Sequence, residues 1–83
     1  MAKLTAVFNR FPEHELVIHR LCGQEPDFMG VCEDYEEAVA ALRRWEEAGA
    51  GHVERAREYR VILDEIESDI REEISTYLAR LPR

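Results

Sequence analysis

Apolar residues recur at steps of three and four along most of the chain, which is the spacing of a helix with one buried face. In residues 27–48 this stripe comprises Phe28, Val31, Tyr35, Ala38, Leu42 and Trp45. Cys32 and Val39 widen it, so the pattern is typical of a helix in a bundle rather than a narrow coiled-coil seam. Asp27 is the predicted N-cap, because its carboxylate can accept a backbone N–H of the first turn.

Residues 52–81 form the second long predicted helix. Its apolar stripe comprises Ala56, Tyr59, Leu63, Ile66, Ile70, Ile74, Tyr77 and Leu81. The steps of three, four and four after Leu63 break a strict heptad, which predicts a nearly straight helix. The sequence AGAG at residues 48–51 separates the two long helices, and a turn centred on Ala50 makes them an antiparallel hairpin.

Two shorter segments precede this hairpin. Residues 1–11 have apolar positions in helical spacing over one or two turns, and residues 12–23 predict a short helix. Pro12 suits a first helical turn, and Gly23 suits a left-handed C-terminal cap. We therefore predict an all-α fold, an antiparallel helical hairpin with a shorter N-terminal helix, as one small domain of residues 1–83.

Composition narrows the classes of function. The 83 residues carry a net charge of -7, and Lys3 is the only lysine beside ten arginines. An acidic chain is poorly suited to neutralising phosphates, so we expect no nucleic-acid partner. No signal peptide and no run of ~20 apolar residues is visible, so we expect no membrane association and a cytoplasmic location. Two cysteines are too few for a disulfide framework, which favours a reducing compartment.

Some apolar residues have no partner within the predicted hairpin. The last helix outruns the one before it, and Leu16 projects away from the face that carries Ile18 and Cys22. Trp45 flanks the turn, where an exposed aromatic side chain would suit a partner. We therefore predict a symmetric homodimer that forms a larger helical bundle. The candidate interface residues are Leu16, Trp45, Tyr77, Leu78 and Leu81.

Three stretches carry a resemblance to a known family. They are FPEHELVIHRL, DFMGVCEDYEEAVAAL and ILDEIESDIREEI, within residues 11–44 and 58–74. In this pattern the chain resembles the YdcH-like proteins, small bacterial helical hairpins of uncharacterised function. It departs from them in its longer N-terminal segment, its AGAGH turn and a last helix that is not lysine-rich. The resemblance implies a helical-hairpin architecture and no catalytic residues.

The stretch PEHELVIHRLC is the best candidate for metal chemistry. His14 and His19 are five residues apart, about 140° around a helix, whereas zinc on one helix favours histidines four apart. A site of His14, Cys22 and Cys32 is conceivable, with His19 or Glu15 completing it. No C-x-x-C pair would hold two ligands locally, and free cysteines are commonly buried without any ligand role. We therefore expect no metal or other cofactor.

Other charged or reactive groups have simpler explanations. Both cysteines lie on apolar faces, which disfavours the thiolate that a nucleophile requires. In EDYEE, residues 33–37, the glutamates lie off the apolar stripe, so we expect a solvated face. In the last helix we expect ion pairs of the i, i+4 type between Arg60 and Asp64 and between Glu67 and Arg71.

These patterns together predict a protein that is not an enzyme. We expect a self-associating helical hairpin that acts as a protein–protein interaction module. One alternative is a metal- or small-molecule-binding bundle that uses His14, Cys22 and Cys32. A further alternative is an accessory subunit that docks on a larger enzyme through Leu16 or the region of Trp45.

Overall fold

The computed structural model describes residues 3–82, with the exception of the side chain of Ala50. Residues 1, 2 and 83, which the predicted domain includes, lie outside this part. Helices account for most of the described chain, and residues 3–82 contain no strand, so the all-α prediction is confirmed. None of the helices in this range is long and apolar enough to cross a membrane.

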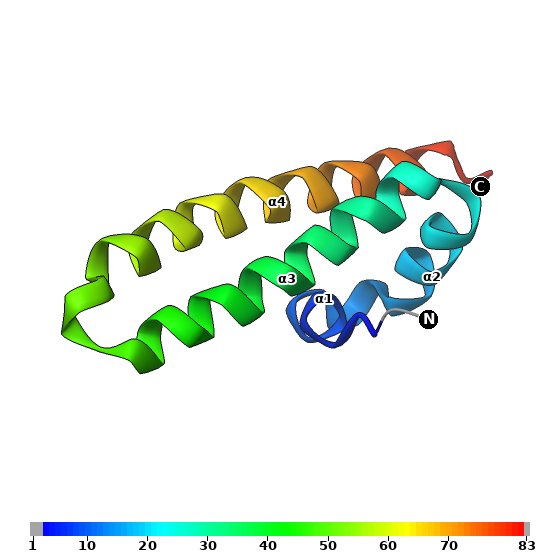
Figure 1. Cartoon of the computed structure of the whole chain (residues 1–83). Helices are drawn as coiled ribbons and strands as arrows, with labels where there is room; N and C mark the ends of the chain where they lie inside the picture. Colours follow the sequence, from blue (N-terminus) through cyan, green and yellow to red (C-terminus); the bar gives the residue numbers. More distant parts are fainter. Residues whose placement is uncertain (1–2, 83) are drawn as a thin grey trace.

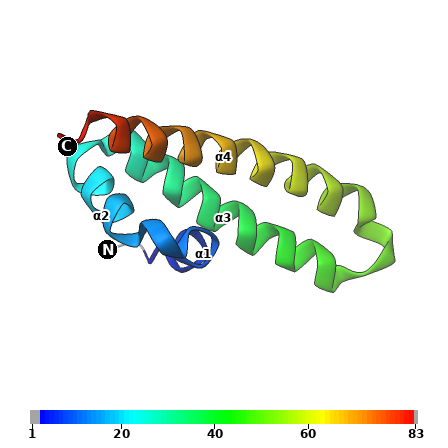
Figure 2. The same cartoon turned by 180° about the vertical axis from the view of Figure 1, so that it is seen from behind.

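Two long helices form the hairpin that the sequence predicts. In chain order the elements are α1 Thr5–Arg10, a 3-10 turn Pro12–His14, α2 Glu15–Gln24, α3 Pro26–Ala48, a second 3-10 turn Ala50–His52 and α4 Val53–Arg80 (Figure 1). α3 and α4 run antiparallel and contact each other. α2 lies beside the start of α3, at the end of the hairpin where α4 ends, and α1 lies beside the middle of α3 (Figures 1 and 2).

The turn between α2 and α3 differs from the prediction. Gly23 lies inside α2, and Glu25 follows the helix with an extended backbone, φ -126° and ψ 99°. α3 begins at Pro26, whose missing N–H costs nothing in a first turn. The predicted left-handed cap at Gly23 and the predicted N-cap at Asp27 are therefore wrong, since Asp27 already lies within the first turn of α3.

The turn between the long helices depends on a glycine. Gly49 follows α3 with φ 92° and ψ -162°, a backbone conformation that side chains with a Cβ rarely adopt. It is the only residue of positive φ in the described part of the chain. Its backbone conformation reverses the chain direction, and the 3-10 turn Ala50–His52 then leads into α4.

The buried side chains are concentrated in one half of the hairpin. We call residues 41–62 the tip and the remaining described residues the base. The base contains a contiguous core of Leu4, Val7, Phe11, Ile18, Leu21, Phe28, Cys32, Tyr35, Ala38, Leu63, Ile70 and Ile74. In the tip, the buried residues among the described side chains are Ala41 and Ala56. The base therefore has a core of large side chains, whereas in the tip the fully buried side chains are small and Leu42, Trp45 and Tyr59 are half-buried.

The buried face of α3 is broader than the predicted stripe. Cys32 and Ala41 are buried, whereas Val31, Leu42 and Trp45 are only half-buried. α3 contacts α4 along one side and α1 and α2 along another, so its buried surface follows two neighbours rather than one. The predicted stripe assumed that α3 contacts one helix only, so it did not allow for a second neighbour.

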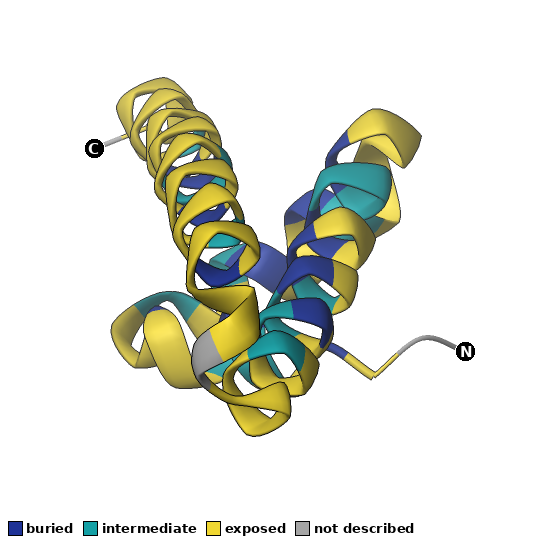
Figure 3. Ribbon diagram, turned by 60° about the vertical axis from the view of Figure 1, so that its left-hand side comes forward, coloured by how far each residue is buried: buried dark blue, intermediate teal, exposed yellow. Residues whose placement is uncertain are grey.

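The end of α4 also differs in part from the prediction. Tyr77 is half-buried and packs against the core, so the expectation that it lacks a partner within the chain is wrong. Leu78 and Leu81 are 42% and 43% exposed, although Leu81 belongs to the predicted buried stripe. The outer side of α4 is exposed along its length, with buried positions confined to its inner side (Figure 3).

Candidate functional site

The two cysteines of the candidate metal site lie next to each other. Cys22 on α2 is half-buried, Cys32 on α3 is fully buried, and the two thiols are within hydrogen-bonding reach. Burial raises the pKa of the Cys32 thiol to about 12. Burial also raises the pKa of Cys22, and the hydrogen bond from Cys32 offsets part of this shift. Both side chains are therefore stable as neutral thiols, which are poor nucleophiles.

The histidines do not complete this pair. His14 ends the first 3-10 turn and borders a surface depression with Phe11 and Arg71. His19 stacks against the Phe8 ring, with ring centroids 4.8 Å apart, instead of turning toward Cys22. Within residues 3–82, no three side chains of histidine, cysteine, aspartate or glutamate are grouped so that they could hold a metal ion. The structure brings together two of the three predicted ligands and leaves out His14.

The acidic segment of α3 is not a uniform solvated face. Glu36 is half-buried, and its carboxylate accepts backbone N–H groups of Ala6 at 3.0 Å and Val7 at 2.8 Å. No side chain of α1 itself caps this short helix. Glu36 thus caps α1 from α3, and the prediction for this residue is wrong. A carboxylate at a helix N-terminus also interacts favourably with the helix dipole.

A second carboxylate joins three helices. Glu67 of α4 accepts a hydrogen bond from the Arg10 guanidinium of α1 at 2.8 Å and another from the Tyr35 hydroxyl of α3 at 2.7 Å. Burial and the Glu67 carboxylate raise the pKa of the Tyr35 hydroxyl. This cluster fixes α1 against both arms of the hairpin.

The predicted ion pairs within α4 are therefore wrong. Glu67 pairs with Arg10 rather than Arg71, and the Arg71 guanidinium lies 5.6 Å from the Phe11 ring centroid. Arg60 reaches across the hairpin to Glu46 of α3 at 3.0 Å. Contacts to neighbouring helices replace the local i, i+4 pairs, because long side chains at the edge of an interface can reach either.

The five candidate interface residues have different surroundings. Leu16 is 62% exposed, in accordance with its place on the outer side of α2. Trp45 is half-buried at the tip, and its ring lies 4.9 Å from that of His52. Tyr77 packs against the core, whereas Leu78 and Leu81 are exposed near the end of α4. These residues do not form one continuous surface, because Leu16 and Trp45 lie at opposite ends of the hairpin.

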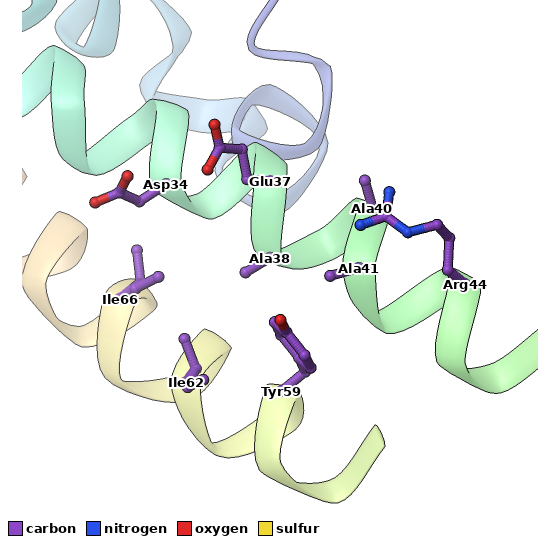
Figure 4. Close-up of a pocket in the computed structure, with 9 residues that line it drawn as sticks. All are labelled: Asp34, Glu37, Ala38, Ala40, Ala41, Arg44, Tyr59, Ile62 and Ile66. Carbon is purple, nitrogen blue, oxygen red and sulfur yellow. The ribbon is translucent and has the colours of Figure 1, made fainter. Parts of the chain in front are cut away.

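An open groove lies between α3 and α4. Its volume is about 530 Å³, and it opens where the base core ends. We call it the hairpin groove, and it is lined by Asp34, Glu37, Ala38, Ala40, Ala41, Arg44, Tyr59, Ile62 and Ile66 (Figure 4). Small alanines form its α3 wall, and the larger apolar side chains come from α4.

Charges mark the two ends of the hairpin groove. Asp34 lies nearest Ile66, Glu37 follows it along α3 with its carboxylate pointing away from α4, and Arg44 comes from the next part of α3 toward the tip, with its guanidinium beside Ala40 (Figure 4). Ile62 is 41% exposed between these ends. The groove is therefore apolar in its middle, acidic toward the base and basic toward the tip.

The three consecutive apolar residues Val61, Ile62 and Leu63 are the feature of the sequence that could have indicated this groove. Three consecutive apolar residues on a helix span about 200°, so at least one lies off any single buried stripe. Leu63 is in the core, and Val61 is 53% exposed on the other side of α4 from the groove. Ile62 lies four residues before Ile66 on the groove face, an arrangement that the predicted stripe leaves out.

A second depression of about 490 Å³ lies between α1 and α3. Its lining includes Arg10, Tyr35 and Glu36, whose polar atoms already hold the base together through the contacts described above. This depression is therefore part of the contact between α1 and α3. In the hairpin groove, by contrast, no hydrogen bond or ion pair joins the two walls within the described residues.

Comparison of this chain with protein-family models, curated proteins and solved structures finds no match. The resemblance to the YdcH-like proteins stays a prediction, because no match tests it. Inference about function therefore depends on the hairpin groove and on its surroundings.

Proposed function

We propose that this protein is a non-enzymatic interaction module that self-associates through the hairpin groove. The observation that carries this proposal is the unfinished packing of the tip. Ile62 is 41% exposed in an open groove, while the buried side chains described there are Ala41 and Ala56. Two alanine methyl groups and the half-buried Leu42, Trp45 and Tyr59 provide less hydrophobic stabilisation than the large buried side chains of the base.

A second copy of the chain fits this groove in size and in charge. The hairpin groove, which extends from the tip into the base, has small residues on α3 and large ones on α4, so each copy can place a large side chain against the exposed Ala40 of the other. The groove carries both signs of charge, as a self-complementary surface requires. A hairpin that dimerises in this way forms a four-helix bundle over the tip.

Self-association also explains why the tip can remain weakly packed in one chain. A small domain has limited apolar area to bury, and a partner chain is one of the common means of completing its core. The base core already satisfies residues such as Ile18 and Ile70, which are 0% exposed. Exposed large apolar side chains lie in both parts of the hairpin, Val53, Val61 and Ile62 in the tip and Leu16, Leu78 and Leu81 in the base, and Ile62 is the one of them that lines the hairpin groove.

Sedimentation velocity over a series of protein concentrations tests this proposal. We expect the wild-type chain to sediment as a dimer at high concentration and Ile62→Glu to remain a monomer. Val61→Glu is the matched control, because Val61 is the adjacent residue, is 53% exposed and does not line the groove. A wild-type chain that stays monomeric at millimolar concentration would contradict the proposal, and so would an Ile62→Glu variant that dimerises like Val61→Glu.

A further inference from the structure

The side chains of the hairpin groove are arranged in a polar order along α3. Asp34, Glu37, Ala41 and Arg44 step by three, four and three residues, so they lie along one stripe of the helix. Asp34 and Arg44 are about 15 Å apart along the helix axis. The order along this stripe is acid, acid, alanine and base.

The stripe of α4 that faces the groove also becomes acidic toward the base. Ile62, Ile66, Asp69 and Glu73 step by four, three and four, and the first two line the groove. Because α4 runs antiparallel to α3, Asp69 and Glu73 continue this stripe toward the base, the end that also holds Asp34. The acidic end of this face therefore has contributions from both helices.

The charged residues of the groove form no ion pair with the other described residues of the chain. In the described part of the molecule, none of Asp34, Glu37 and Arg44 takes part in an ion pair within 4 Å. By contrast, Glu36, Glu46 and Glu67 accept hydrogen bonds from other helices. The charges beside the groove are thus available to a second molecule.

We propose that the second copy docks antiparallel, with a two-fold axis near the exposed Ala40. This inference rests on the proposed self-association and specifies its geometry. The axis lies midway between the acidic and basic ends of the α3 stripe, so Arg44 of each copy meets Asp34 and Glu37 of the other. A two-fold axis makes this contact twice.

The opposite, parallel arrangement is disfavoured by charge. It would place the acidic end of one chain beside the acidic end of the other. It would also place Arg44 of one chain beside Arg44 of the other. Two chains of net charge -7 already repel each other, and like charges held together across an interface weaken it further. Ala40 is small and exposed, so it allows the two α3 helices to approach closely at the axis, whereas Ala38 and Ala41 are already buried within their own chain.

Charge reversal on the intact chain tests the orientation. Arg44→Glu makes the groove face wholly acidic, and we expect its dimer dissociation constant to rise roughly tenfold or more. Arg43→Glu is the matched control: it makes the same change of charge at the adjacent residue, which borders the depression between α1 and α3. We expect Arg43→Glu to change the dissociation constant by less than about threefold.

A swapped variant separates the antiparallel dimer from the parallel one. Asp34→Arg, Glu37→Arg and Arg44→Glu in one chain reverse the polarity of the α3 stripe. In an antiparallel dimer this variant pairs with itself again, within about fivefold of the wild-type affinity, and does not pair with the wild-type chain. In a parallel dimer the swapped and wild-type chains prefer each other, because opposite charges then meet.

Native mass spectrometry of a mixture of a mass-tagged swapped variant and the wild-type chain distinguishes these outcomes. Homodimers of each chain without heterodimers support the antiparallel arrangement. Heterodimers in excess of both homodimers overturn it and leave the proposed self-association intact, as does an Arg44→Glu dimer as strong as that of Arg43→Glu. If the wild-type chain itself forms no dimer, the proposed function fails and this arrangement fails with it.

Discussion

The base and the tip of the hairpin contain the same two helices but differ in packing. In the base, Val7, Ile18, Cys32 and Ile70 are 0% exposed, and four helices contribute to one core. In the tip, only α3 and α4 run beside each other, and Ile62 is 41% exposed. The comparison indicates that most of the buried packing lies in the base, and the proposed self-association assigns the tip to a partner.

The polar contacts follow the same division. The base contains Glu36 at the N-terminus of α1 and Glu67 between α1, α3 and α4. Across the tip, the ion pair from Arg60 to Glu46 joins two side chains that are about half exposed. Exposed pairs contribute little to stability, because solvent screens them. Predictions about stability therefore concern the base, and predictions about association concern the tip.

The largest expected effect comes from shortening a buried side chain of the base. Ile70→Ala should lower the free energy of unfolding by about 2 to 5 kcal/mol, because it removes buried methyl groups and leaves a cavity. Ile62→Ala makes the same chemical change in the groove and should cost less than about 1 kcal/mol at concentrations where the chain is monomeric. Urea unfolding followed by circular dichroism measures both values. Equal losses for the two variants would remove the distinction between base and tip.

The second prediction concerns alkaline pH. In the folded chain the pKa of Cys32 is about 12, above the ordinary value of 9.0, so the unfolded chain loses this proton first as pH rises. Stability from the neutral thiol is present below pH 9 and is lost between pH 9 and about 12, by roughly 2 to 4 kcal/mol. Urea unfolding of Cys32→Ala over this pH range should show a shallower decline. Some loss of stability at alkaline pH should remain in Cys32→Ala, because the pKa of the Tyr35 hydroxyl is also raised in the folded chain.

The hydrogen bond of Tyr35 gives a smaller effect. Tyr35→Phe removes the hydroxyl that donates to Glu67 at 2.7 Å, and we expect a loss of about 1.5 to 3 kcal/mol, since the acceptor is a carboxylate. Tyr59→Phe is a suitable control, because Tyr59 is half-buried in the groove and its hydroxyl donates no hydrogen bond within the described residues. Thermal unfolding of the monomer should separate the two variants. A loss as large for Tyr59→Phe would contradict the role given to Glu67.

The smallest expected effect is local to α1. Glu36→Gln weakens the cap at Ala6 and Val7, and we expect about 1 kcal/mol less protection of the α1 amides. Glu37→Gln, the neighbouring substitution beside the groove, should leave α1 unchanged. Hydrogen exchange of the α1 amides provides the readout. Unchanged exchange in Glu36→Gln would show that α1 does not depend on this carboxylate.

The hairpin itself could be predicted from the sequence. Apolar spacing and the glycine-rich turn predict helices at residues 27–48 and 52–81, and the structure has them at Pro26–Ala48 and Val53–Arg80. Helix ends were less predictable: the sequence offers Gly23 and Asp27 as caps, and the chain uses Pro26 instead. Local preferences at a helix end differ by only about 1 kcal/mol, so packing can override them.

The binding surface could be predicted less well. Helical spacing identifies the face with most apolar residues, but α3 contacts neighbours on two sides, and Ile62 lies just outside the predicted stripe of α4. The roles of Glu36 and Glu67 depend on which helix passes each carboxylate, and spacing within one helix contains no such information. For the same reason the sequence could suggest that Cys22 approaches Cys32 but not whether His14 joins them.

Hydrogen exchange of the tip at several protein concentrations tests most directly whether a second copy completes the core of the tip. We expect amides of residues 41–62 to exchange at least about tenfold more slowly at millimolar than at low micromolar concentration. A larger fraction of the chain is then dimeric, and contact with the second copy stabilises the tip against local opening. Amides of the base near Ile18 and Ile70 should exchange at rates that change much less. Exchange in the tip that is independent of concentration, or protection that rises equally in both halves, would contradict this account.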